Sequence, residues 1–267
     1  YFKKSKKYAK KIFVLLHDLI PIRNPEFCTT SQSLTHKKRL INTINFSDTI
    51  ATISKYVRND ILDFIQANNL KFNDKIHVLY PGPSFEGKNF HHCDQNHKFT
   101  GYHLMIGTIE GRKRYDFVLE FLLREIHNDS PIKKLIIVGQ KGWKDEKFLN
   151  LLKTNDLGQS LFLLDNCEDD ELVDLYKNCH GVIFASDAEG FGLPLIDAVF
   201  FKKPVIANKL SVFREIAGNY PYYYDNNSYD SFKNSLKLSK MFNYNDREKV
   251  FLPSWDQHFK IFEKIIN

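Results

Sequence analysis

No apolar run in this sequence reaches the roughly 18–20 residues that a membrane-spanning helix needs. The stretch that follows the lysine-rich start, 12–16, is also too short for the apolar core of a signal peptide. The sequence has no low-complexity tract, and its four cysteines stand apart with no C-x-x-C pair. Because a chain of 267 residues can bury a large core without disulfides, we expect reduced thiols and a cytoplasmic protein.

Most of the chain has no net positive charge. Six lysines and no acidic residue lie in 1–11, and the remaining residues carry equal numbers of basic and acidic side chains. A nucleic-acid-binding protein usually spreads its basic residues over a face, so we expect no nucleic-acid partner. Two interpretations of the basic arm, Lys3–Lys11, stay open: a solvated helix before a buried strand, or a peripheral contact with an anionic membrane.

The sequence also has no convincing metal site. It has no D-x-D motif, and the spacing of its one metal-like cluster fits no structural zinc pattern. We therefore expect neither a metal nor another cofactor. The members of the cluster are His91, His92, Cys93, Asp94, His97 and His103.

Short apolar runs alternate with helical patterns along the chain, which is typical of parallel α/β architecture. In the first part, Ser54 is a plausible N-cap for a helix over Ser54–Asn68, and the polar stretch 84–100 reads as a connection between domains. Three strands are predicted there, at Lys11–Leu16, Thr49–Ile53 and Lys75–Tyr80.

The second part predicts a full doubly wound sheet followed by a last helix at about Trp255–Ile266. Its six strands are predicted at Tyr102–Gly107, Lys134–Gly139, Ser160–Leu164, Gly181–Ala185, Pro204–Ala207 and Tyr222–Tyr224. Its helices are predicted at Lys113–His127, Asp145–Lys153, Asp169–Lys177, Leu193–Phe201, Val212–Ala217 and Tyr229–Lys240.

The most informative segment is ASDAEGFGLPLIDA, Ala185–Ala198, in which a strand, a glycine-containing loop and a helix follow one another. The N–H groups at the start of such a helix, with the positive end of its dipole, suit a pyrophosphate. Glu189 and Asp197 lie on either side of this anion site, and their carboxylates suit paired sugar hydroxyls. The alternative is an ordinary turn with two solvated acids.

This segment resembles the E-x7-E element of retaining GT-B glycosyltransferases of family 4 (group 1), with Asp197 in place of the second Glu. GTIEGRK, Gly107–Lys113, resembles the G-T-I-E-P-R-K element of the family's donor domain, and Gly111 stands where Pro is usual. HDLIP, His17–Pro21, resembles the H-D-x-x-P of the N-terminal domain. We expect Asp18 to have a structural role, in which its side chain caps the following turn.

The resemblance implies the GT-B fold, with two Rossmann-like domains on parallel sheets. We expect an N-terminal acceptor-side domain over 1–95, a donor-binding domain over 96–252, and a C-terminal helix over 253–267 that packs back on the N-terminal domain. Because the first residue is Tyr1 and the first part has only about three strands, we expect the beginning of the N-terminal domain to be missing from the sequence. Such a chain should bind nucleotide but transfer sugar poorly.

The resemblance also implies roles for individual residues. Glu189 would bind the transferred sugar, His17 would contact that sugar near the reacting centre, and Arg112 with Lys113 would neutralise the donor's phosphates. Asp197 would hold the ribose. The implied donor-binding residues are Gly107, Arg112, Lys113, Gly139, Asn166, Phe191, Gly192, Leu193 and Asp197.

The expected activity is retaining transfer of a mannose- or rhamnose-like hexose from a GDP-, UDP- or dTDP-linked donor. The expected acceptor is a saccharide or a lipid-linked saccharide of a surface polysaccharide such as the lipopolysaccharide O-antigen, at the inner face of the membrane. Two other classes stay open: a non-catalytic nucleotide-sugar-binding module of a larger protein, and another GT-B enzyme such as a sugar-nucleotide epimerase or a phosphorylase.

Overall fold

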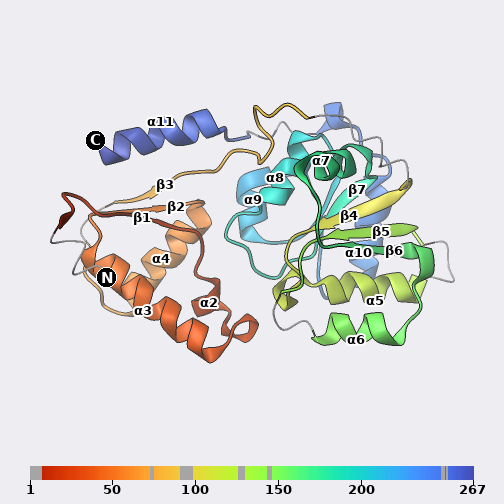
Figure 1. Cartoon of the computed structure of the whole chain (residues 1–267), viewed down its shortest axis with the longest axis horizontal. Coiled ribbons are helices and arrows are strands. Elements are labelled where there is room, and N and C mark those ends of the chain that lie inside the picture. The colour runs from red at the N-terminus through yellow and green to blue at the C-terminus, as the bar shows by residue number, and fades with distance from the viewer. Residues whose placement is uncertain are drawn as a thin grey trace. The chain divides into compact units, whose positions relative to one another are not determined.

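The computed structural model describes residues 8–72, 75–90, 99–125, 130–142, 146–247, 250 and 252–267. The chain forms two compact units, each built on its own parallel sheet (Figure 1). Unit 1 comprises Tyr1–Pro83, Glu189–Gly192 and Pro253–Asn267, and unit 2 comprises Ser84–Ala188 and Leu193–Leu252. The division after Pro83 places Ser84–Phe90, expected as part of the connection, with unit 2.

Unit 1 has a three-stranded sheet in the order β1-β2-β3. All pairs are parallel, with Phe13 opposite Thr49 and Ile50 opposite Ile76. The strands are β1 (Phe13–Leu16), β2 (Thr49–Thr52) and β3 (Ile76–Val78). The helices are α2 (Ile20–Arg23), α3 (Thr30–Phe46), α4 (Lys55–Ala67) and α11 (Trp255–Ile266), with a short 3₁₀ turn, η1 (Pro25–Phe27).

The core of unit 1 lies between this sheet and its helices. In α4, Val57, Ile61 and Phe64 recur at helical spacing and are buried, and Ser54 caps the helix by accepting a hydrogen bond from the Val57 N–H at 3.1 Å. The C-terminal helix α11 belongs to the same unit, where Phe262 meets Phe13 edge-on with ring centroids 5.1 Å apart. Helix α4, with Ser54 as its N-cap, confirms the predicted helix over Ser54–Asn68.

Helix α3 was not predicted from the sequence. It has 17 residues, of which only Leu40, Thr43 and Ile44 are buried, so it has no long apolar stripe to reveal it. A capping box nevertheless marks its start: the Thr29 hydroxyl accepts from the Gln32 N–H at 3.2 Å, and Gln32 accepts from the Thr29 N–H at 2.9 Å.

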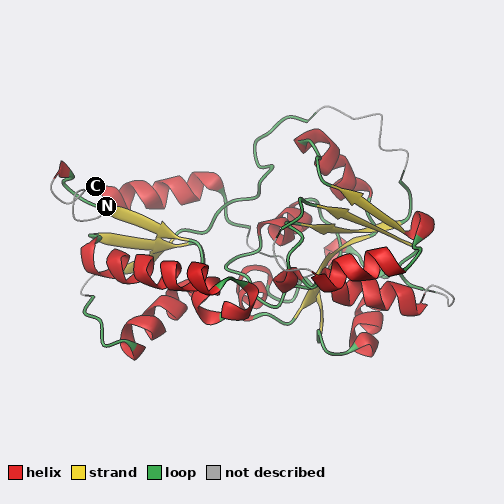
Figure 2. Ribbon diagram, turned by 60° about the horizontal axis from the view of Figure 1, so that its bottom comes forward, coloured by secondary structure: helices red, strands yellow, loops and turns green. Residues whose placement is uncertain are grey.

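Unit 2 has a six-stranded sheet in the order β6-β5-β4-β7-β8-β9, with all pairs parallel. Figure 2 shows helices on both faces of this sheet. Its strands are β4 (Tyr102–Ile106), β5 (Lys134–Val138), β6 (Leu161–Leu164), β7 (Gly181–Phe184), β8 (Val205–Asn208) and β9 (Tyr222–Tyr224). Its helices are α5 (Tyr115–Glu125), α6 (Glu146–Thr154), α7 (Asp169–Asn178), α8 (Leu193–Phe200), α9 (Ser211–Ala217) and α10 (Tyr229–Ser239), with 3₁₀ turns η3 (Gly111–Lys113), η4 (Gly158–Ser160) and η5 (Tyr244–Asp246).

The predicted strands agree with these bounds to within a residue or two. One helix start was wrong: Lys113 ends a 3₁₀ turn, Arg114 takes a left-handed conformation with φ 53°, and α5 begins only at Tyr115. The left-handed residue interrupts the helical hydrogen bonding that the sequence pattern suggested across this point. His127 and Asp145, the predicted ends of two helices, lie outside the described residues.

The strand order of unit 2 contains a switch point. From β4 the chain builds the sheet outward through β5 and β6, and then returns to the other side of β4 to add β7, β8 and β9. The loops that follow β4 and β7 therefore leave neighbouring strands at their carboxyl ends and turn to opposite sides. Ligands of doubly wound sheets bind at such a crevice.

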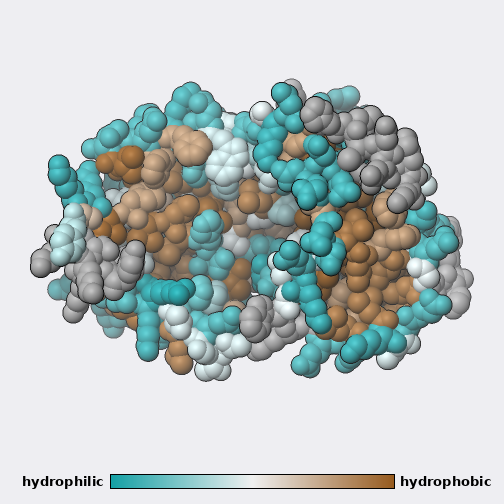
Figure 3. Space-filling model, viewed as in Figure 1, coloured by the Kyte–Doolittle hydropathy of each residue, from teal (hydrophilic) through white to brown (hydrophobic). Residues whose placement is uncertain are grey.

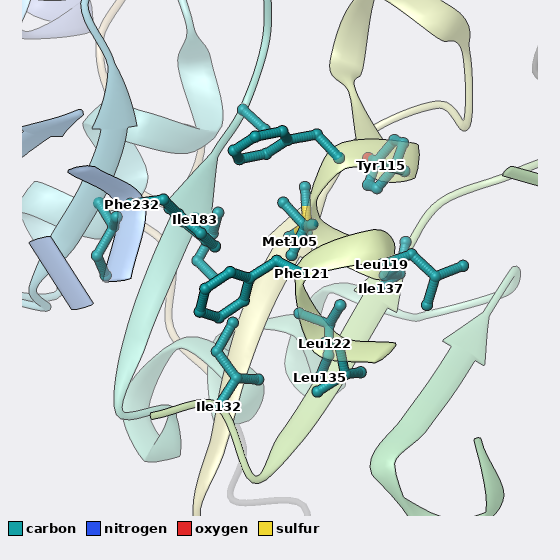
Figure 4. Packing of buried hydrophobic residues seen from close by; sticks show 14 of the residues in the cluster. Met105, Tyr115, Leu119, Phe121, Leu122, Ile132, Leu135, Ile137, Ile183 and Phe232 are labelled. Atoms are coloured by element: carbon teal, nitrogen blue, oxygen red, sulfur yellow. The ribbon is translucent and has the colours of Figure 1, made fainter. Parts of the chain in front are cut away.

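The core of unit 2 lies on the face of the sheet that α5 covers. Figure 4 shows Phe121 and Leu122 from α5 among Met105, Ile137 and Ile183 from the strands, and all five are no more than 2% exposed. On the surface, apolar side chains gather over the region of β5, β6 and α5 and over the strands of unit 1 (Figure 3).

Among the residues described, no helix combines the length and the apolar character needed to span a membrane.

Candidate active site

The carboxyl end of β4 carries a glycine that is required by its conformation and its surroundings. Gly107 has φ +132°, which side-chain-bearing residues rarely adopt. A Cβ there would lie 3.4 Å from Cε and 3.5 Å from Nζ of Lys113, so the Lys113 side chain lies over this glycine. The Tyr115 hydroxyl donates to the Gly107 carbonyl at 2.7 Å, which fixes the strand end beneath Lys113.

Gly139 at the end of β5 allows the next loop to approach. A Cβ at Gly139 would overlap the carbonyl oxygen of Gly107. Beyond it, the Ile109 N–H donates to the Gln140 carbonyl and the Gly142 N–H to the Ile109 carbonyl, both at 2.9 Å. The carboxyl ends of β4 and β5 therefore present closely packed backbone, as a phosphate- or nucleotide-binding edge requires.

Arg112 joins the loop after β4 to the loop after β7. Its guanidinium pairs with Glu110 at 2.6 Å and donates to the Ala188 carbonyl at 2.8 Å, while its own carbonyl accepts from the Asp187 N–H at 2.8 Å. The side chain is 19% exposed. Arg112 therefore braces the crevice as well as carrying a positive charge there.

The sequence did not predict a second set of contacts at this crevice, made by Asp187 with Arg114 and Asn226. Arg114 pairs with Asp187 at 2.9 Å, and the Asn226 amide donates to the other carboxylate oxygen of Asp187 at 2.7 Å. Asp187 lies inside the segment that the sequence singled out, but nothing in the sequence indicated its partners, which lie 73 and 39 positions away. The network holds the loop that precedes Glu189.

The loop Glu189–Gly192 belongs to unit 1 and packs within it. The Ser54 hydroxyl donates to the Gly190 carbonyl at 2.7 Å. A Cβ at Gly190 would overlap the His17 carbonyl and lie 2.9 Å from the Asp18 Cβ, so only glycine fits at the carboxyl end of β1. The structure thereby brings the half-buried Glu189 and the exposed His17 into the same neighbourhood.

The neighbours of these residues act structurally. Asp18 accepts the Ile20 N–H at 2.9 Å and so caps the turn into α2, which confirms the sequence interpretation. Phe191 is 3% exposed, with its ring centroid 6.2 Å from that of Tyr80, so it offers a ligand its backbone rather than its side chain. Gly192 has φ +109° and leads into α8.

Asp197 lies one turn into α8 and is 3% exposed. One carboxylate oxygen accepts the Ser84 N–H at 2.7 Å, so Asp197 holds the first residues of unit 2. Burial raises the pKa of Asp197 to about 6, while the hydrogen bonds from Ser84 and the positive charge of Lys88 act in the opposite direction. This partner of Asp197 was not predicted.

The remaining predicted donor residues lie in unit 2. Leu193 begins α8 and is 37% exposed, and Asn166 is exposed just beyond the carboxyl end of β6. The acidic run after it forms the start of α7, where the Glu168 N–H donates to Glu171 at 3.2 Å, as expected for a helix N-terminus.

No group of three or more potential metal-ligating side chains occurs among the described residues. Of the metal-like cluster, His103 lies near the amino end of β4, away from the switch point, while His91, His92, Cys93, Asp94 and His97 lie outside the described residues.

In the basic arm, Lys3, Lys4, Lys6 and Lys7 also lie outside the described residues. Lys11 donates to the Ile266 carbonyl of α11 at 3.3 Å.

Residues 95–243 match the family described as glycosyl transferases group 1. The serotype-specific mannosyltransferase WbdA of Escherichia coli is 30% identical over an alignment of 230 residues, and the match covers 79% of this chain and 27% of that protein. The O-antigen chain mannosyltransferase B of Escherichia coli is 24% identical over an alignment of 225 residues, and the match covers 80% of this chain and 57% of the relative. This chain thus spans about a quarter of the length of WbdA.

The fold is similar to that of a sucrose-phosphate synthase from Thermosynechococcus elongatus. The two structures superpose with a TM-score of 0.68 at 12% sequence identity, over 99% of this chain and 69% of the other. At that identity the likeness concerns the fold alone.

Proposed function

Since the chain belongs to the family of glycosyl transferases group 1 and has the GT-B fold, we propose that it transfers a hexose from a nucleotide-diphosphate sugar. The acceptor is a saccharide or a lipid-linked saccharide in surface polysaccharide biosynthesis. Relatives named as mannosyltransferases, two of them as O-antigen chain mannosyltransferases, favour a mannose-like donor, and a rhamnose-like donor is the alternative.

The observation that carries the proposal is the convergence of two loops at the switch point of unit 2. The loop after β4 brings Lys113 over Gly107, and Arg112 ties this loop to Ala188 in the loop after β7. A diphosphate placed there would meet the charge of Lys113, the packed backbone at Gly139 and the amino end of α8. The nucleoside would extend toward Asn166 beyond β6.

In unit 1, Glu189 and His17 supply the sugar-facing groups of the proposal. A carboxylate accepts two sugar hydroxyls at once, and an imidazole at the end of β1 either donates or accepts a hydrogen bond. No protein nucleophile enters the proposed mechanism. The leaving diphosphate receives its negative charge while Lys113, Arg112 and the start of α8 stabilise it, and it takes the proton of the attacking acceptor hydroxyl on the same face. The anomeric configuration is thereby retained.

We propose that no metal takes part, because the cationic side chains occupy the role that a divalent ion has in metal-dependent transferases. We also place the protein in the cytoplasm at the inner membrane face. The basic arm Lys3–Lys11 would hold it reversibly to anionic lipid, with at most about 1 kcal/mol per lysine, weakened by salt. Vesicle co-sedimentation at low salt, comparing the wild type with a variant whose six lysines are changed to Gln, tests this contact.

The test of the main proposal is incubation with a panel of GDP-, UDP- and dTDP-linked sugars. Both the release of nucleoside diphosphate and the transfer to a saccharide acceptor are measured. Turnover with one donor and its loss in Glu189→Ala would support the proposal. Tight binding of a nucleotide sugar with no turnover would favour a binding module, and conversion of the donor to its epimer would favour an epimerase.

A further inference from the structure

Unit 2 has a cavity at the edge of its sheet opposite the switch point. The cavity measures about 490 Å³ and lies at the amino ends of β4, β7 and β8. Its volume falls within the range of small-molecule sites, roughly 300–1,000 Å³. Within the described part of the chain, its lining has no acidic residue. The side chains relevant here are His103, His180, Lys202, Lys203, Lys240 and Phe242.

The three lysines Lys202, Lys203 and Lys240 carry more positive charge than the nearby helix ends can balance. Helices α7, α8 and α10 end beside the cavity, and each helix end carries at most about half a negative charge. Lys203 already serves one of these ends, since its ammonium donates to the Cys179 carbonyl at 3.4 Å. Lys202 lies over the Tyr244 ring at 4.9 Å. No described acidic residue forms an ion pair with any of these lysines, so net positive charge remains at the cavity.

His103 gives a second and independent observation. It is 3% exposed, it lines the cavity, and its Nδ1 has no hydrogen-bond partner among the described residues. Polar atoms buried this deeply normally have a partner. Its ring centroid lies 6.2 Å from that of His180. Burial, with the nearby His180 and Lys240, lowers the pKa of His103 to about 3, so the ring is neutral and its nitrogens supply one donor and one acceptor.

We propose that this cavity binds a phosphate group, with Lys202 and Lys240 as its ionic contacts and the His103 imidazole, which lines the cavity, as a hydrogen-bonding partner. The phosphate belongs either to a small dissolved molecule or to a lipid head group. Phe242 and Pro204 give the cavity an apolar wall for the rest of the ligand. The site is separate from the proposed donor site. His103 lies near the amino end of β4, whereas the loop of the donor site follows the carboxyl end of the same strand.

The experiment is a titration with inorganic phosphate at constant ionic strength, followed through the imidazole NMR signals of His103 and His180. We expect saturable shifts in the wild type and at least fivefold weaker binding in Lys202→Gln/Lys240→Gln. Lys237→Gln, at an exposed lysine in the last turn of α10, which ends just before Lys240, is the matched control and should bind as the wild type does. Lys113→Gln separates this site from the proposed donor site, and it should leave the His103 shift unchanged.

A second arm replaces phosphate with vesicles that contain phosphatidic acid. Binding that depends on Lys202 and Lys240 in the phosphate arm supports a dissolved ligand, and the same dependence only in the vesicle arm supports a lipid head group. Equal binding by the wild type and the double variant in both arms would overturn the proposal. Sugar transfer is measured separately on the same proteins. Absence of transfer would contradict the proposed function but would not affect the interpretation of the phosphate-binding result.

Discussion

The Ser54 hydroxyl donates to the carbonyl oxygen of Gly190 at 2.7 Å, although the two residues are 136 positions apart. The same hydroxyl accepts the Val57 N–H and so caps α4. One buried side chain therefore fixes both the start of a helix and the loop that carries Glu189. A Cβ at Gly190 would overlap the His17 carbonyl, so the loop lies in close backbone contact with the end of β1.

We expect Ser54→Ala to lower both stability and transfer. The loss of a helix cap costs about 1 kcal/mol, and the unsatisfied carbonyl of Gly190 adds roughly 1–3 kcal/mol. Urea unfolding measures the sum, and steady-state transfer should fall because Glu189 is no longer held. Ser254→Ala is the matched control, because Ser254 caps α11 through the Gln257 N–H and has no described bond to this loop. If Ser54→Ala kept full turnover, Ser54 would be a helix cap only.

Glu189→Gln should abolish transfer. The side chain is half-buried in a loop, so the amide fits the same space but removes the charge that holds two sugar hydroxyls. The affinity for the nucleoside diphosphate alone should stay at the wild-type value, and calorimetry checks this. Glu263→Gln, exposed on α11, is the control for loss of a carboxylate. Wild-type turnover in Glu189→Gln would contradict the assignment of the sugar site.

Lys113 and Arg112 should each weaken donor binding when changed to Gln. Lys113 lies over Gly107, and its loss should weaken donor binding by roughly 1.5–3 kcal/mol, the contribution of a charged hydrogen bond. Arg112 also bonds to Glu110 and Ala188, so Arg112→Gln should lower the melting temperature as well. Donor titration and thermal unfolding of the two variants separate these effects. Wild-type donor affinity in Lys113→Gln would contradict its role at the donor's phosphates.

The same assignment predicts that transfer survives EDTA, because these cations stabilise the leaving diphosphate without a divalent ion. Full inhibition by EDTA that is reversed by Mg²⁺ or Mn²⁺ would contradict a metal-free mechanism.

The strands could be predicted because parallel strands buried on both faces are short, continuous apolar runs, such as Lys134–Val138 and Gly181–Phe184. The positions of the loops followed from the glycines and the strand ends. Helix α3 could not be predicted from periodicity, since only Leu40, Thr43 and Ile44 of its 17 residues are buried.

The long-range partners were also beyond sequence reasoning. Ser54 contacts Gly190 across 136 positions, and Ser84 contacts Asp197 across 113. No local pattern encodes such a pair, because each partner forms an ordinary cap or turn in its own segment.

Asp197→Asn should change stability and nucleotide binding in opposite directions. The pKa of Asp197 in the folded protein is about 6, above its ordinary value of 3.8. Burial therefore favours the protonated form, and the associated stability is present below about pH 4 and lost as the pH rises to about 6. Asn keeps an oxygen for the Ser84 N–H but carries no charge. We expect the variant to equal the wild type near pH 4 and to be more stable by roughly 1–3 kcal/mol at pH 7.

Urea unfolding between pH 4 and pH 8 measures this difference, with Asp165→Asn as the control at an exposed carboxylate. If Asp197 also holds the ribose, the variant should bind the nucleoside diphosphate more weakly at pH 7, by roughly 1.5–3 kcal/mol, because the neutral amide loses the charge-assisted hydrogen bond. Greater stability with unchanged nucleotide affinity would assign Asp197 to the Ser84 contact alone. A stability difference that is independent of pH would contradict the raised pKa, because a group whose pKa differs between the folded and unfolded states must make stability depend on pH.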